Sequence, residues 1–123
     1  MSFAESRNRA LDLADRLHEL GPITVTRFFG GARLVRTGVQ FAFVINGVVY
    51  LRVDDLSRPD FEALGASPFT YEGRSKPVIV ASYYELPDEI RDNLDELRRW
   101  AIRAIHAAMA AKLTSKHRRP RPF

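Results

Sequence analysis

Cysteine is absent from this chain of 123 residues. Its absence excludes a disulfide framework, thiolate chemistry and zinc sites with cysteine ligands. Histidine is almost as scarce, and the three copies, His18, His106 and His117, lie far apart in the sequence. None pairs with another histidine or with a carboxylate at a spacing that suggests a ligand set. We therefore expect neither a bound metal nor a cofactor.

Long apolar segments are missing as well. No run approaches the roughly 20 residues that a membrane-spanning helix needs. The first seven residues include Glu5 and lack the apolar stretch of a secretory signal. The hydrophobic fraction of 46% and the charged fraction of 28% are typical of a globular domain with one core. We expect a cytoplasmic protein that does not associate with a membrane.

Positive charge is concentrated at the C-terminal end. The formal net charge is +4, yet the last twelve residues contain five Lys and Arg and no acid. The other 111 residues hold 14 Lys and Arg against 15 Asp and Glu, so a domain-wide basic face for nucleic acid is not predicted. Residues 114–123 contain two prolines and no periodicity. They predict a disordered basic tail beside a single domain over residues 1–113.

Apolar periodicity and turn residues divide the chain into elements. Apolar residues at helical spacing predict a first helix that ends before Gly21 and Pro22. Residues 23–27, 32–36, 39–45 and 48–53 have strand composition, and Asn46-Gly47 favours a type I′ hairpin turn. A short helix follows from Pro59 to Gly65. Two further strands and a long final helix complete the order, at residues 69–72, 78–84 and about 94–112.

This order predicts the fold class. Strands joined by hairpins form an antiparallel sheet, and amphipathic helices need an apolar sheet face to cover. We expect a two-layer α+β domain with five to six strands, in the order α-β(3-4)-α-β(2)-α. Period-two alternation places Phe41, Phe43 and Ile45 on one face of their strand. The face without helices carries Tyr50, Arg52 and one of the two adjacent tyrosines, so the candidate partner contacts are Tyr50, Arg52, Tyr83 and Tyr84.

Several segments, taken in order, resemble the N-terminal domain of the TfoX/Sxy family of bacterial competence regulators. The resemblance spans roughly residues 10–110, with Phe28 where the family usually has methionine and Arg33 near a usual glycine. The matching segments are Arg-Phe-Phe-Gly-Gly (27–31), Phe-Ala-Phe-Val (41–44) with Gly47, Tyr-Leu-Arg-Val-Asp (50–54), Pro-Phe-Thr-Tyr (68–71), Lys-Pro-Val (76–78), Ser-Tyr-Tyr-Glu-Leu-Pro (82–87), Leu97 and Trp100-Ala101.

The resemblance implies a fold, a role and a type of partner. It implies an antiparallel sheet backed by helices, self-association into a homodimer, and no catalytic activity. It also implies a part in the regulation of genes for DNA uptake, alongside a transcription regulator such as the cyclic-AMP receptor protein. The resemblance thus favours a non-enzymatic module that acts through protein contacts.

The residues themselves offer few sites for chemistry. The Phe29-Gly30-Gly31 segment lacks the spacing of phosphate-binding loops, which favours a tight turn or bulge. The acid pairs Asp54-Asp55 and Asp88-Glu89 stand at element ends, where carboxylates cap helices and turns. The tyrosines at 83 and 84 are the best small-ligand contacts, but alternation favours burying one and leaving the other at the rim.

Two further features leave nucleic-acid binding open as an alternative. The aromatics at 69–71 could stack bases, although few Lys or Arg accompany them, which favours core packing. The tail could act as an electrostatic arm on nucleic acid, or it could serve only as a solubilising terminus. The residues of this candidate arm are Lys116, Arg118, Arg119 and Arg121.

Overall fold

The structure is a computed structural model that describes the backbone of residues 3–117 and the side chains of residues 3–114. The helices are α1 (Phe3–Arg16), α2 (Arg58–Ala63), α3 (Asp88–Arg91) and α4 (Leu94–His117), with a 3₁₀ turn at His18–Leu20. The strands are β1 (Ile23–Phe28), β2 (Gly31–Arg36), β3 (Val39–Ile45), β4 (Val48–Arg52), β5 (Pro68–Glu72) and β6 (Pro77–Glu85).

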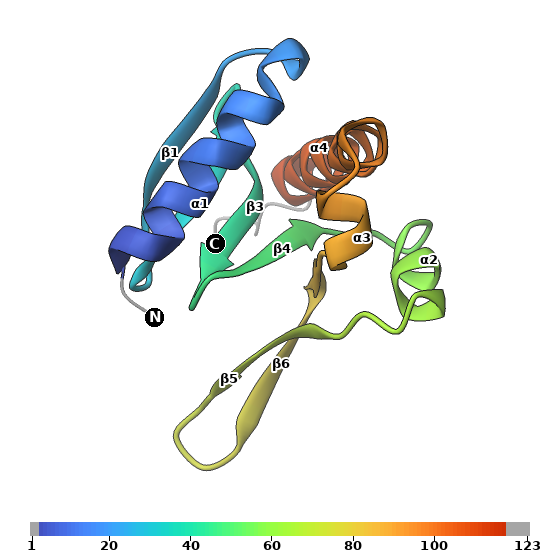
Figure 1. Ribbon diagram of the computed structural model, residues 1–123. Helices are drawn as coiled ribbons and strands as arrows, with labels where there is room; N and C mark the ends of the chain where they lie inside the picture. The colour runs from blue at the N-terminus through green and yellow to red at the C-terminus, as the bar shows by residue number, and fades with distance from the viewer. Residues whose placement is uncertain (1–2, 118–123) are drawn as a thin grey trace.

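The strands form one open antiparallel sheet in the order β1-β2-β3-β4-β6-β5. Helix α1 packs on β1, β2 and β3, and α4 packs on β3 and β4. Both long helices cover the same side of the sheet (Figure 1). The predicted two-layer α+β fold is therefore confirmed, with six strands.

Three hairpin turns set the register of the first four strands. Each has positive φ at its two central residues, as a type I′ turn requires. The predicted Asn46-Gly47 turn is confirmed, with φ of 52° and 77°. The same geometry occurs at the pairs Phe29-Gly30 and Thr37-Gly38. These turns make the first half of the sheet a simple meander.

The core lies between the sheet and the two long helices. Small residues on α4 let the helix approach the sheet closely, and Ala101 and Ala104 are almost completely buried. Helix α1 is fixed at the β3–β4 turn by two hydrogen bonds. The Gly47 N–H donates to the Ser6 hydroxyl at 3.1 Å, and the Arg9 guanidinium donates to the Gly47 carbonyl at 2.8 Å.

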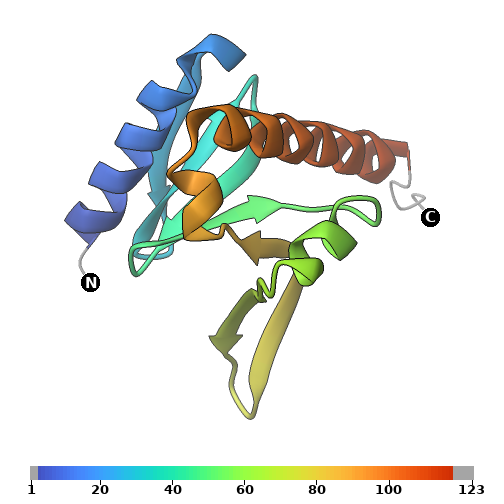
Figure 2. The ribbon, with the colours of Figure 1, turned by 45° about the vertical axis from the view of Figure 1, so that its right-hand side comes forward.

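Helix α4 is longer than the sequence predicts. It ends at His117 rather than near Lys112, and Figure 2 shows it running on past the strands that it covers. Neither glycine nor proline occurs between Leu94 and Arg119, so nothing in the sequence stops the helix at the expected place. The predicted tail thus starts within α4, and residues 118–123 lie outside the described part of the chain.

The pattern of strand β3 departs from strict alternation at Phe41. The β2–β3 register shifts between Leu34 and Val35, whose partners are Ala42 and Gln40, so Phe41 has no partner on β2. This is a β-bulge, which turns two successive side chains toward one face. Phe41 and Ala42 both belong to the core. The prediction that Phe41 shares a face with Phe43 is therefore wrong.

The β5–β6 hairpin forms an arm that projects from the rest of the sheet (Figures 1 and 2). Strand β6 pairs with β4 only at its end, through Tyr83, Tyr84 and Glu85. Its beginning pairs with β5 instead, and the β5–β6 register shifts between Pro68 and Phe69. The unmatched residues of β6 let the arm bend away from the sheet plane.

Within residues 3–117, no helix is long and apolar enough to cross a membrane.

Candidate functional site

The face of the sheet opposite the two long helices is lined by aromatic rings, and we call it the open face. Phe43 lies opposite Tyr50 across β3 and β4, and directly opposite residues point to the same face. The Phe43 ring is only 2% exposed, because other rings surround it. Its centroid lies 5.1 Å from that of Phe28, 5.2 Å from Tyr50, 5.0 Å from Phe69 and 4.7 Å from Tyr83.

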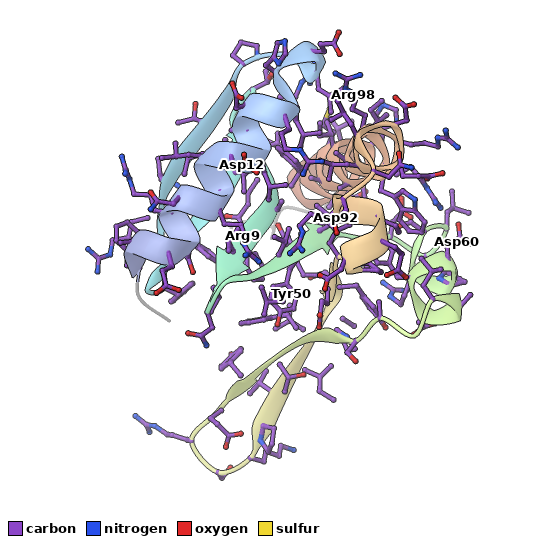
Figure 3. All side chains as sticks on the ribbon, viewed as in Figure 1. Arg9, Asp12, Tyr50, Asp60, Asp92 and Arg98 are labelled. Carbon is purple, nitrogen blue, oxygen red and sulfur yellow. The ribbon has the colours of Figure 1, made fainter. Side chains whose placement is uncertain are left out.

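An apolar hollow of about 460 Å³ lies on the open face, and we call it the aromatic hollow. The β1–β2 turn forms one wall, β3 the floor, and the projecting arm the other wall. Tyr50 lies beside it, between β4 and the arm (Figure 3). No charged side chain lines the hollow, whose lining residues are Phe28, Phe29, Phe43, Ile45, Phe69, Tyr71, Val80 and Tyr83.

Two aromatic side chains at the lips of the aromatic hollow face solvent. Tyr71 on the arm is 49% exposed, and Phe29 on the β1–β2 turn is 84% exposed. Phe29 also has a φ of 46°, which is uncommon for a bulky residue. A local conformation of this kind costs about 1–3 kcal/mol and is typical of functional sites. The protein thus presents a large ring to water at a backbone position that ordinarily selects glycine or asparagine.

A second hollow of about 520 Å³ adjoins the aromatic hollow, and we call it the cationic hollow. It lies between the start of β3, the end of β4 and the last part of α4. Tyr83 lines both hollows and forms the wall between them. The cationic hollow has two positive side chains and no acidic one among its lining residues, which are Gly38, Val39, Gln40, Arg52, Tyr83, Ala108, Ala111 and Lys112.

The two cations of this hollow lack acidic partners. Among residues 3–114, neither Arg52 nor Lys112 forms an ion pair. The Arg52 guanidinium carbon lies 5.5 Å from the centroid of the Tyr83 ring. Its Nε is buried and has no hydrogen-bond partner in the part of the chain that the structure describes. An anion that entered this hollow would meet two positive charges and no acidic side chain.

The structure brings three of the four predicted contacts together on the open face. Tyr50 and Arg52 point to it as expected, and Tyr83 lies opposite Arg52. Burial, together with the nearby Glu85 carboxylate, raises the pKa of Tyr50. Burial also raises the pKa of Tyr83, and the Arg52 charge opposes this effect. Both phenols therefore stay neutral at physiological pH, and the Tyr83 hydroxyl donates to the Gln40 carbonyl at 3.3 Å.

Tyr84 lies on the other side of the sheet. It belongs to the core, and its hydroxyl donates to the Glu62 carboxylate at 2.7 Å. That hydrogen bond raises the pKa of Tyr84. The prediction that one tyrosine is buried and the other lies at the rim is wrong, because Tyr83 is 7% exposed and Tyr84 4% exposed. Rings cover Tyr83 on the open face, while helices cover Tyr84 on the opposite face.

Three acids of the two predicted pairs make contacts within a few residues along the chain. Asp54 Oδ1 accepts hydrogen bonds from the Ser57 N–H at 2.8 Å and the Leu56 N–H at 3.0 Å. Burial on its own would raise the pKa of Asp54, but these hydrogen bonds outweigh it and lower the pKa. Asp55 pairs with Arg58, and Asp88 with Arg91. Residues 3–117 contain no group of three His, Asp or Glu that could hold a metal ion.

The candidate nucleic-acid arm falls mostly beyond the described part. Lys116 lies in the last turn of α4, and Arg118, Arg119 and Arg121 lie outside the described residues.

Sequence reasoning missed the aromatic hollow, although it identified the rings at 69 and 71. Composition is the signal that could have indicated an aromatic surface, since the chain contains eight phenylalanines and four tyrosines.

Comparison with protein families gives a match. The family model for the TfoX N-terminal domain matches residues 15–108, which is more than half of the chain. No curated protein matches the chain. The matched range begins within α1 and ends within α4, so it includes all six strands and every lining residue of the aromatic hollow, whereas Ala111 and Lys112 of the cationic hollow lie beyond it.

Proposed function

Because the chain belongs to the TfoX N-terminal domain family, we propose that it is a regulatory binding module without catalytic activity. It acts in the cytoplasm through protein contacts, as part of the control of genes for DNA uptake. The observation that carries this proposal is the aromatic hollow of about 460 Å³, with Phe29 84% exposed at its lip. Exposed aromatic clusters are typical of surfaces where proteins meet partners.

A matched pair of substitutions tests this proposal. Phe29→Asn removes the exposed ring and keeps a residue that tolerates positive φ. Ile79→Ser is the control, since Ile79 is 67% exposed but does not line the aromatic hollow. We expect transcript levels of DNA-uptake genes, and recovery of transcription proteins by pull-down from native cells, to change only with Phe29→Asn. Identical transcripts and identical recovered proteins for both variants and for the original chain would contradict the proposal.

Self-association into a homodimer is a further expected property. Strands β1 and β5 are the two ends of the sheet, and an unpaired sheet edge readily pairs across a two-fold axis. We expect light scattering to give twice the monomer mass at high concentration. Phe29→Asn should leave that mass unchanged, because it does not touch the edge strands' pairing groups. A monomer mass at every concentration would rule out this assembly.

Nucleic-acid binding through the C-terminal arm is the second candidate function. Five Lys and Arg without any acid in the last twelve residues favour it. If the arm binds DNA, deletion of residues 114–123 should abolish binding in a fluorescence anisotropy titration. Before deletion, affinity should fall steeply as salt rises, because each neutralised phosphate releases counterions. Unchanged affinity after the deletion would exclude the arm as the binding element.

A further inference from the structure

We propose that the aromatic hollow and the cationic hollow together bind an acidic peptide segment that carries bulky apolar side chains. The apolar side chains of the peptide fill the aromatic hollow. A carboxylate of the same peptide enters the cationic hollow and contacts Arg52 and Lys112. This inference rests on the proposed function, and it adds the chemistry by which the protein partner is recognised.

The first argument is that the two hollows are neighbours. Tyr83 lines both of them, so a peptide that spans this residue reaches from the aromatic hollow to the hollow that contains Arg52. The volumes of about 460 Å³ and 520 Å³ lie within the range of roughly 300–1,000 Å³ that is typical of ligand sites. Two side chains of different character, close together along one peptide, can therefore occupy the two hollows at once.

The second argument is charge. Neither hollow has an acidic residue in its lining, and Arg52 and Lys112 have no ion pair within residues 3–114. A hydrogen bond to a charged group is among the stronger ones. A carboxylate in the cationic hollow would accept such a bond from the Arg52 guanidinium, and Lys112 adds a second favourable charge.

The third argument separates a peptide from a nucleic-acid strand. Proteins that bind single strands place cations along the whole groove, beside the rings on which the bases stack. The aromatic hollow has no Lys or Arg in its lining, and both cations lie at one end, beyond Tyr83. A nucleic-acid strand in the aromatic hollow would leave its phosphates without partners. A peptide needs only one or two charges at that end.

Selection from a library of random short peptides, displayed on phage against the full chain, tests the proposal even while the partner is unidentified. We expect the enriched peptides to combine Leu, Ile or Phe with Asp or Glu. Synthetic copies of these peptides are then titrated in fluorescence anisotropy. Affinity should fall about tenfold with Arg52→Gln, consistent with loss of a charge-assisted contact, and again with Lys112→Gln. Phe29→Asn should weaken the same peptides.

Matched controls separate the site from general charge and hydrophobicity. Arg99→Gln removes an exposed arginine of α4 whose partner is Glu96, and Ile79→Ser removes an exposed apolar side chain from the arm. Both should leave peptide affinity unchanged. Absence of enrichment, enrichment of peptides without acids, or equal losses with Arg52→Gln and Arg99→Gln would each overturn the proposal. Tighter binding of single-stranded DNA, lost with Arg52→Gln, would overturn it in favour of nucleic acid.

The outcomes also distinguish this inference from the proposed function. If Phe29→Asn alters gene regulation in cells while Arg52→Gln does not, the regulatory surface stands and the acidic partner is excluded. Enriched peptides that match the chain's own residues 54–56 would indicate a second copy as the occupant, because Leu56 is 84% exposed and follows two aspartates. In that case Arg52→Gln should also lower the mass in light scattering, and the separate partner would be excluded.

Discussion

Gly31→Ala is expected to destabilise the protein by about 3 kcal/mol or more, at the upper end of overpacking effects. Gly31 is the first residue of β2, opposite Phe28. A Cβ atom at this position would lie 2.0 Å from the Val44 carbonyl oxygen and 3.0 Å from Ile45 Cγ1. The first of these atoms belongs to the backbone of β3, which cannot move without breaking the β2–β3 ladder. Since domains are stable by only about 5–15 kcal/mol, this loss would remove a large share of the free energy of unfolding.

The neighbouring glycine provides the control for this prediction. Gly30 has a φ of 78°, and a Cβ atom added there would have no neighbouring atom within 4 Å, so Gly30→Ala costs only the strain of the left-handed backbone. That strain is roughly 1–2 kcal/mol for an L-residue. Urea denaturation followed by circular dichroism gives both free energies of unfolding. Equal losses in the free energy of unfolding for the two variants would show that the clash of a Cβ atom with Val44 is not the reason why glycine occupies position 31.

The segment 27–31 therefore combines four separate tasks. Phe28 contributes a wall of the aromatic hollow and Phe29 its lip. Gly30 permits the turn, and Gly31 permits β2 to approach β3. One short motif thus shapes the hollow and fixes the strands that support it. The family resemblance of segment 27–31 therefore bears both on the arrangement of the strands and on the shape of the aromatic hollow.

Local chemistry accounts for the parts of the fold that the sequence predicts. The Asn46-Gly47 turn needs only residues that accept positive φ. Asn93 caps α4, since the Glu96 N–H donates to its side-chain oxygen at 3.1 Å. In each case the deciding interaction lies within four residues along the chain. Alternation likewise predicts Tyr50 and Arg52 on the open face, because β4 is regular.

Features that depend on distant residues could not be predicted in this way. Phe41 joins the core because the β2–β3 register shifts, and no local pattern marks the shift. The aromatic hollow forms only when the arm brings Phe69 and Tyr71 near the β1–β2 turn. Arg52 and Lys112 are far apart in the sequence, and only the packing of α4 on β3 and β4 brings them to one hollow. Fold class therefore follows from periodicity, whereas the site follows from tertiary packing.

Phe43→Ala is the second substitution with a large expected effect, a loss of about 3–5 kcal/mol as for other buried phenylalanines. Phe43 is 2% exposed and contacts four other rings on the open face. Ring pairs of this kind contribute about 0.5–1.5 kcal/mol beyond the burial of area. Its removal should therefore lower stability and also open the floor of the aromatic hollow. Urea denaturation measures the first effect.

A pair of milder substitutions separates stability from recognition. Phe43→Leu and Phe41→Leu each replace a buried ring, one on the open face and one in the core. Both should cost a similar free energy of unfolding, because both positions are almost fully buried. Only Phe43→Leu should weaken the peptides selected on the open face, since only Phe43 lines the aromatic hollow. Equal weakening by Phe41→Leu would mean that peptide binding depends on overall stability and that the aromatic floor has no specific part in it.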